Sequence, residues 1–239
     1  MFVDSDDYIE PDVLPILMTQ INREQLDALR INYQNVRLTD EGYYEVFNPY
    51  KYPHIVDKRS DVVPGEQYLN ERMGYGCYAM QFIVRRTMVP LFTKGLHFED
   101  VEWLPRMLLA VNRVNATQLV VYNYLIRSGS ISHVVGNKEK VKKNVGDCMT
   151  IISRYNSYIA EHPACSWLRN MQCSMVVSAL ANVAQFLYED RHEYISRLQF
   201  MGVFPLSIAN QGRTYCRKAR LLNVSPELAV KILHFKNNM

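Results

Sequence analysis

This sequence lacks any pair of cysteines with a metal-binding or redox spacing. The five cysteines are odd in number and lie far apart: Cys77, Cys148, Cys165, Cys173 and Cys216. The absence of a CxxC pair excludes the usual zinc and dithiol motifs, so the pattern predicts reduced thiols. No apolar run approaches the roughly 18 to 20 residues that span a bilayer, and no signal-peptide pattern is visible. We therefore expect a cytoplasmic protein.

The sequence also lacks a strong charge, internal repeats and low-complexity tracts. Its formal net charge is only +3, which gives a nucleic-acid partner little electrostatic support, and we expect none. An apolar content of 48% with 21% charged residues is ordinary for a folded protein. A chain of 239 residues can bury a substantial core, as one domain or as one domain with a helical appendage.

The first informative feature is an acidic cluster in residues 2–9 (Phe-Val-Asp-Ser-Asp-Asp-Tyr-Ile). Asp4, Asp6 and Asp7 repel one another unless a cation lies among them, and oxygen ligands favour Mg²⁺ or Mn²⁺. The apolar residues in front predict a buried strand that delivers these carboxylates at its carboxyl end, where open α/β sheets bind ligands. The alternative is an acidic turn that caps a helix beginning near Pro11.

A second acidic group stands in residues 95–103 (Gly-Leu-His-Phe-Glu-Asp-Val-Glu-Trp). It precedes an amphipathic segment in which Leu104, Met107, Leu108, Val111 and Val114 are spaced for one buried face. Asp100 would lie at the helix N-terminus, where the dipole favours a carboxylate that can act as a general base. The alternative is again a helix cap. Pro105 argues against a regular helix unless the helix begins only at about residues 101–104.

Together these segments resemble the family 2 glycosyltransferases of bacteria, which have the GT-A fold. Residues 2–9 resemble the DxD segment, and the resemblance implies that Asp4, Asp6 and Asp7 bind the nucleotide-sugar diphosphate, with Asp4 and Asp6 as metal ligands. Residues 98–103 resemble the ED segment. The resemblance implies that Asp100 deprotonates the acceptor hydroxyl in an inverting transfer, with Glu99 as its neighbour or as an alternative base.

Two further segments resemble the same family. Residues 74–79 resemble the glycine-containing loop that lies against the donor sugar, which implies donor contacts at Gly74 and Gly76. Residues 122–132 resemble the tyrosine-rich strand and Arg-x-x-Ser-Ile ending, in which Arg127 could pair with the diphosphate. His133 stands where some relatives place a late metal ligand, although a structural or solvated histidine is the simpler interpretation.

The resemblance covers residues 1–133 and departs from the family in one respect. The family's fold begins with about ninety residues of alternating strands and helices that carry the nucleobase pocket, whereas this sequence begins at the DxD segment. We therefore expect an α/β fold: a partial GT-A mixed sheet without its first βαβ units in residues 1–136, then a helical region in residues 137–239. As a fragment the chain could be inactive, or ordered only in a homo-oligomer.

Local patterns outline the remaining elements. Residues 11–29 predict a helix, residues 28–33 a short strand, and residues 35–47 a hairpin around the turn Asp40-Glu41-Gly42. Residues 48–64 predict a surface loop, residues 66–73 a helical turn, and residues 118–126 a strand. Helical spacing recurs in residues 138–160, 165–188 and 189–200, and Ser225-Pro226-Glu227 predicts the start of a last helix. The lysine-rich run of residues 138–143 predicts a solvated helix face or a contact with anionic lipid.

The sequence thus predicts a metal-dependent, inverting glycosyltransferase. It would move a sugar from a nucleotide-diphosphate donor to a hydroxyl of a cell-surface glycan or a lipid-linked acceptor, with possible peripheral contact with a membrane. The first alternative is a noncatalytic remnant of this fold that acts as an interaction or scaffold module. A metal-dependent phosphotransfer enzyme is the second, but a Gly-rich phosphate loop with its lysine is missing.

Overall fold

The computed structural model describes residues 1–47, 61–74, 76–127, 137–208 and 212–237. The chain forms two compact units. The first, which we call the sheet unit, contains residues 1–92 and 103–135. The second, which we call the helical unit, contains residues 93–102 and 136–239. The segment that carries Glu99 and Asp100 therefore belongs to the helical unit.

Two long parallel strands form the centre of the sheet unit. Strand β2 (Ala28–Leu38) pairs in parallel with β5 (Val114–Leu125), and Val36 lies opposite Leu125 near their carboxyl ends. Strand β1 (Tyr8–Ile9) pairs antiparallel with β5, and β3 (Tyr44–Val46) and β4 (Phe82–Val84) pair antiparallel with β2. The order is β1-β5-β2-β3, with β4 also on β2. The mixed sheet expected from the sequence is confirmed.

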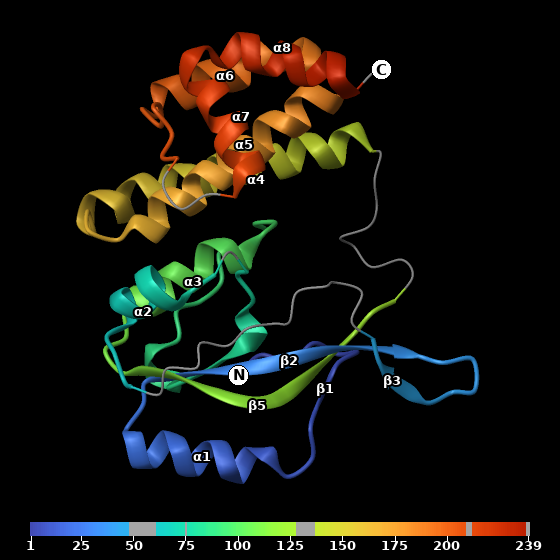
Figure 1. Ribbon diagram of the computed structural model, residues 1–239, viewed down its shortest axis with the longest axis vertical. Helices are drawn as coiled ribbons and strands as arrows, with labels where there is room; N and C mark the ends of the chain where they lie inside the picture. Colours follow the sequence, from blue (N-terminus) through green and yellow to red (C-terminus); the bar gives the residue numbers. More distant parts are fainter. Residues whose placement is uncertain (48–60, 75, 128–136, 209–211, 238–239) are drawn as a thin grey trace. The chain divides into compact units, whose positions relative to one another are not determined.

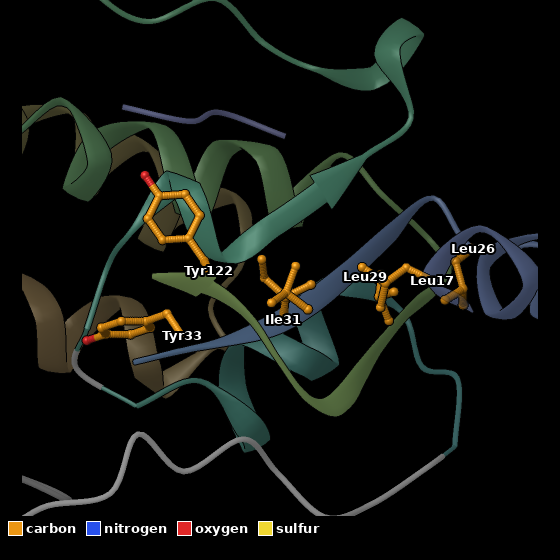
Figure 2. Close-up of a cluster of buried hydrophobic side chains, with 7 residues drawn as sticks. Leu17, Leu26, Leu29, Ile31, Tyr33 and Tyr122 are labelled. Carbon is orange, nitrogen blue, oxygen red and sulfur yellow. The ribbon is translucent and has the colours of Figure 1, made fainter. Parts of the chain in front are cut away.

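Helices cover both faces of this sheet, as Figure 1 shows. Helix α1 (Val13–Glu24) lies on one face, and α2 (Gly65–Arg72) lies on the other with residues 103–109 of α3 (Glu99–Leu109), the part of that helix in the sheet unit. Figure 2 shows a core cluster that joins α1 to the two central strands. Its members are Leu17, Leu26, Leu29, Ile31, Tyr33, Val121 and Tyr122. Alternate residues of β2 enter this cluster because side chains along a strand point to opposite faces.

The hairpin and the apolar face of the second acidic segment are confirmed. Leu38 pairs with Tyr44 across the turn, in which Gly42 has a φ of 86° that suits glycine. The five apolar residues spaced for one face are all buried: Leu104, Met107, Leu108, Val111 and Val114. However, α3 ends at Leu109, so Val111 lies in the following turn and Val114 begins β5.

Three local predictions are wrong. Phe2 and Val3 form no strand and are 37% and 45% exposed, so the strand follows the acidic cluster instead of leading into it. The carboxyl end of the helix predicted over residues 11–29 is wrong, because α1 ends at Glu24, whereas the strand predicted over residues 28–33 is confirmed as part of the longer β2. Helix α3 begins at Glu99 and contains Pro105, against the expectation of a later start.

The helical unit is built around α5 (Ser166–Phe186), whose buried residues occupy several sides of the helix, as expected for a central helix. Around it lie α4 (Lys138–Glu161), α6 (Arg191–Phe200), α7 (Arg213–Val224) and α8 (Pro226–Asn237). The predicted cap of α8 is confirmed, because the Ser225 hydroxyl accepts a hydrogen bond from the Leu228 N–H. Helix α7 had no prediction, and its buried residues are only Ala219 and Leu222.

Short 3₁₀ turns complete the described structure: η1 (Ala79–Gln81), η2 (Arg86–Met88) and η4 (Tyr188–Asp190). Across the described part of the chain, every helix is too short or too polar to cross a lipid bilayer.

Gly65 allows α2 to begin against the end of α3. A Cβ at this position would lie 1.9 Å from the Leu108 carbonyl oxygen, and the Gly65 N–H donates to the Val111 oxygen at 2.9 Å. We expect Gly65→Ala to lower the free energy of unfolding by about 1–3 kcal/mol, because backbone must shift to admit the methyl group. The matched control is Gly146→Ala in α4, where a Cβ meets no atom within 4 Å. This change should stabilise by up to about 1 kcal/mol. Equal effects of the two changes in urea unfolding would contradict the packing argument.

Candidate functional site

Asp7 fastens the acidic segment to the end of β5. Its Oδ2 accepts a hydrogen bond from the Tyr122 hydroxyl at 2.6 Å, and its Oδ1 accepts one from the Leu125 N–H at 2.8 Å. The Asp4 N–H in turn donates to the Tyr122 hydroxyl oxygen at 3.1 Å, and the Asp7 N–H donates to the Asp4 carbonyl at 3.2 Å. The turn of residues 4–7 is therefore held by a buried tyrosine from the neighbouring strand.

The electrostatics of Tyr122 keep its hydroxyl in the donating form. Burial raises the pKa of Tyr122 well above its ordinary value; the Asp4 N–H acts against this shift, while the Asp7 carboxylate adds to it. Because Tyr122 is fully buried and stays protonated, it supplies a steady donor to Asp7. Sequence reasoning assigned Asp7 to donor binding, but the structure gives its carboxylate two partners inside the sheet unit.

Asp6 and Arg127 are brought together, as their assignment to one donor site requires. The Arg127 guanidinium forms an ion pair with the Asp6 carboxylate. Arg127 follows β5 directly, and Asp6 lies in the turn that precedes β1, so both reach the same edge of the sheet. The Asp6 side chain is 25% exposed and that of Arg127 is 61% exposed, which leaves both within reach of a ligand. Asp4 is exposed on the same turn.

Asp4 and Asp6 could hold a hard cation only if a phosphate group of the substrate completes the coordination shell of that cation. In the part of the chain that the structure describes, no three His, Cys, Asp or Glu residues are placed to hold a metal ion. Mg²⁺ commonly takes one or two carboxylates and completes its shell with substrate phosphates and water. Asp4 and Asp6 fit that pattern. His133, the third predicted ligand, lies outside the described residues.

The glycine-containing loop is only partly described. Gly74 is exposed just after α2, Gly76 is half-buried, and Tyr75 lies outside the described residues. A Cβ at Gly76 would lie 2.8 Å from the Tyr78 ring, so a side chain there would displace that ring. Tyr78 itself packs edge-on against Tyr33, with ring centroids 5.8 Å apart. The structure thus places Gly76 next to an aromatic pair, and its contact with a donor stays a prediction.

Glu99 and Asp100 occupy the first turn of α3, as predicted for Asp100. Phe98, the residue before them, has a φ of 62°, which is unusual for a bulky side chain and recurs at functional sites. Glu99 is exposed and Asp100 is half-buried. Carboxylates in a first helical turn are stabilised in their charged form by the helix dipole, typically by about 0.3–1 kcal/mol.

A third carboxylate of this segment, Glu102, is held by α4. Glu102 is fully buried and accepts hydrogen bonds from Arg154 Nη1 at 2.8 Å, Tyr158 Oη at 3.2 Å and Thr93 Oγ1 at 3.1 Å. Arg154 Nη1 also donates to Thr93 Oγ1 at 2.6 Å. These contacts tie the first turn of α3 to one face of α4 inside the helical unit. Periodicity could not reveal them, because Arg154 is 52 residues away along the chain.

The same face of α4 explains why Pro105 is tolerated in α3. A proline cannot donate to the carbonyl four residues earlier, which here belongs to Val101. The Tyr155 hydroxyl donates to that oxygen at 2.8 Å and replaces the missing bond. Two to three turns earlier on α4, Lys143 Nζ donates to the Gly95 carbonyl at 2.9 Å, and Asp147 Oδ2 accepts from the His97 N–H at 2.8 Å. Lys143 therefore has a local role beyond the predicted solvated face.

An aromatic cluster of Phe2, Phe92 and Trp103 lies within the sheet unit. Phe2 contacts Trp103 with ring centroids 5.5 Å apart, and both rings pack on Phe92. Trp103 is fully buried and donates through Nε1 to the Pro90 carbonyl at 2.7 Å, so it is a core residue. Phe2 lies two residues before Asp4, and Trp103 lies three residues after Asp100.

Comparison with known proteins supports the class expected from the sequence. The chain is 26% identical over 187 residues to the uncharacterized glycosyltransferase YibD of Escherichia coli (strain K12). The match includes 66% of this chain and 52% of YibD, so the chain spans about half the length of this curated relative. No protein-family model matches the chain. The predicted resemblance to glycosyltransferases is confirmed by this relationship.

Comparison with solved structures identifies the fold of this chain. S. aureus TarS, as residues 1–349 in complex with UDP-GlcNAc, matches with a TM-score of 0.62 at 15% identity, over 99% of this chain and 67% of that chain. The structure of TarS 1–349 alone matches with a TM-score of 0.55 at 16% identity, over 99% and 66% of the two chains. The chain therefore has a TarS-like GT-A fold with a helical carboxyl-terminal region.

Asp7 and Asp6 should respond differently to substitution. Asp7→Ala removes the partner of the buried Tyr122 hydroxyl and of the Leu125 N–H, so we expect a loss of about 2–4 kcal/mol in unfolding free energy. Asp6→Ala removes only a solvent-exposed ion pair and should change stability by less than about 1 kcal/mol. Thermal and urea unfolding of both variants test this difference, and a larger loss for Asp6→Ala would contradict the anchoring role of Asp7.

Arg154 should matter to stability because its partner is buried. Arg154→Met leaves the Glu102 carboxylate without its cation, and we expect the free energy of unfolding to fall by about 3 kcal/mol. This value is at the lower end of the range for broken buried ion pairs, because Arg154 reaches solvent. The control is Arg197→Met in α6, whose pair with Glu193 is exposed at 3.7 Å. Arg197→Met should lower the free energy of unfolding by less than about 0.5 kcal/mol. Similar losses in the two variants would show that the Glu102 contacts contribute little.

Proposed function

We propose that this chain carries the donor-diphosphate and acceptor-activating residues of an inverting glycosyltransferase that uses a UDP-sugar. The observation that carries the proposal is the pairing of Asp6 with Arg127 at the carboxyl end of β5, in a chain with a TarS-like fold. A carboxylate and a guanidinium placed together at a sheet edge suit a metal–diphosphate group. The carboxylate would bind the metal cation, and the guanidinium would bind the phosphate oxygens. TarS was solved with UDP-GlcNAc, which makes this donor the first one to test.

On the donor side, Asp6 and Asp4 would hold Mg²⁺ or Mn²⁺ against the diphosphate. The ion, when bound, supplies Lewis-acid stabilisation of the departing nucleoside diphosphate. The planar guanidinium of Arg127 would leave Asp6 and bind a phosphate oxygen, for which its geometry is suited. Asp7 would act indirectly, because its bonds to Tyr122 and Leu125 hold the turn on which Asp4 and Asp6 lie.

On the acceptor side, Asp100 would take the proton from the attacking hydroxyl, with Glu99 as its neighbour. A single in-line displacement by that hydroxyl inverts the anomeric carbon. The contacts of α4 with Gly95, His97, Val101 and Glu102 support this assignment, because they fix the backbone on both sides of Asp100. Because the backbone on both sides of Asp100 is fixed, less conformational entropy is lost when its carboxylate adopts the reactive position.

The acceptor is proposed to be a glycan or lipid-linked hydroxyl, as the sequence resemblance implies. Cytoplasmic placement, contact with a membrane and a homo-oligomeric state stay predictions.

Calorimetry with UDP-GlcNAc and Mn²⁺ tests the donor site. We expect the wild-type chain to bind, and Asp6→Asn to weaken donor binding about tenfold or more, because a metal carboxylate is lost. The control is Asp40→Asn in the exposed β2–β3 turn, which should bind as wild type. Asp100→Asn should retain donor binding but reduce turnover, followed as UDP release, by about 10²- to 10⁴-fold.

Two outcomes would contradict the proposal. Absence of binding at millimolar donor, with the fold intact, favours the noncatalytic interaction module. Release of phosphate instead of UDP favours the phosphotransfer alternative.

A further inference from the structure

Arg30 is a buried arginine whose charge has no matching partner among the described residues. It lies on β2 with 7% of its surface exposed, and its one hydrogen bond is a long contact of 3.5 Å from Nη2 to Gln81 Oε1. Among the described side chains, Nε and Nη1 of Arg30 are buried nitrogen atoms that have no hydrogen-bond partner. Buried polar groups are nearly always satisfied in folded proteins, and a buried unpaired cation is especially costly.

Two other arginines of this chain show how such a group is normally accommodated. The Arg72 side chain is 2% exposed, but its Nη2 bonds to Asp61 Oδ2 at 2.6 Å and its Nη1 to the Asp61 carbonyl at 2.9 Å. Arg154 pairs with the buried Glu102. Arg30 instead has only the neutral amide of Gln81, which is itself 3% exposed. Within the described structure, the negative charge that Arg30 requires is missing.

Arg30 lies on the face of the sheet opposite the core cluster that Figure 2 shows. Its neighbours Leu29 and Ile31 both enter that cluster, and alternation along β2 puts Arg30 on the opposite face. The strand is central at this point, because Arg30 pairs with Phe82 of β4 and with Ala116 of β5. A cation here is surrounded by sheet on both sides.

Polar groups next to Arg30 are also incompletely satisfied. Asn32, the next residue on the same face of β2, has a buried Oδ1 atom without a described hydrogen-bond donor. Burial raises the pKa of Tyr33, the bond with Tyr78 adds to the rise, and the charge of Arg30 opposes it. The surroundings thus offer unpaired donors at Arg30 and an unpaired acceptor at Asn32.

We propose that Arg30 binds an oxyanion, a phosphate or carboxylate group, and that Asn32 accepts a hydrogen bond from a hydroxyl of the same ligand. Guanidinium N–H groups match oxyanions in charge and in geometry. Phosphorylated and acidic sugars are among the molecules that carry both groups, and they are the class that a glycosyltransferase would use. That last step rests on the proposed function, whereas the oxyanion site itself does not. This site is separate from the Asp6–Arg127 pair.

Thermal unfolding in the presence of inorganic phosphate, with ionic strength held constant by NaCl, tests the oxyanion site. We expect phosphate to raise the Tm of the wild-type chain in a saturable way. Arg30→Met should be at least as stable as wild type without phosphate, because a buried unpaired cation is removed. Its apparent phosphate affinity should fall about tenfold or more, because charge-assisted hydrogen bonds are lost.

Arg37→Met is the matched control. Arg37 lies on the same strand, but its side chain is 52% exposed and it pairs with Glu45. This variant should keep the phosphate response of the wild type. An unchanged response in Arg30→Met, or no response in the wild type, would overturn the proposal.

A crystal structure of the wild-type chain grown with phosphate keeps the test decisive if Arg30→Met does not fold. Density for an oxyanion at Nε or Nη1 supports the site. An ordered water at those atoms, or a rotamer that reaches a carboxylate of the chain, overturns it.

A final comparison separates the Arg30 site from the donor site. If saturating UDP with Mn²⁺ abolishes the phosphate response of the wild type, phosphate binds only where the donor binds, and the separate Arg30 site is overturned. If phosphate or glucuronate still raises the Tm under those conditions, the site reads a separate acidic sugar. A phosphate response that depends on Arg30 in a chain that does not bind UDP-GlcNAc would support this inference while the proposed function fails.

Discussion

The parallel pairing of β2 with β5 is the constraint on which the candidate donor site depends. It brings the carboxyl ends of both strands to one edge, where the Leu125 N–H and the Tyr122 hydroxyl converge on Asp7. That carboxylate fixes the turn of residues 4–7, and Arg127 follows the same strand into contact with Asp6. Parallel pairing needs two buried faces, and α1 on one side with α2 and residues 103–109 of α3 on the other supply them.

The carboxylates of the two motifs divide into anchors and exposed groups. Asp7 accepts a hydrogen bond from the buried Tyr122, and Glu102 is itself buried and held by Arg154, whereas Asp6 and Asp100 keep partial exposure. This division has a physical reason. A short acidic segment repels itself, so it keeps one shape only if some of its charges are neutralised or hydrogen-bonded by the fold. The anchors leave the remaining carboxylates in defined positions, which is what a ligand site requires.

Arg30 shows the opposite situation, because its charge is buried and the described part of the chain provides no carboxylate to pair with it. Stability alone would favour an apolar residue at that position of β2, since a buried cation without an anion costs several kcal/mol. A residue that lowers stability at its own position is typical of sites that are completed by a ligand. Composition and periodicity gave no indication of it, because a single arginine in an apolar strand is visible as a conflict only once its surroundings are known.

The sequence by itself determined the hairpin at Gly42, the apolar face of α3 and the cap of α8, since these depend on local spacing and turn chemistry. The resemblance of its motifs also indicated the likeness to glycosyltransferases. Asp6, Asp100 and Arg127 were also visible in it as motif residues. Only the tertiary structure decided that Asp7 is an anchor, that the strand follows the acidic cluster, and that α4 supports a helix containing Pro105. The reason is that each of these depends on partners more than fifty residues away along the chain, and no local pattern encodes such contacts.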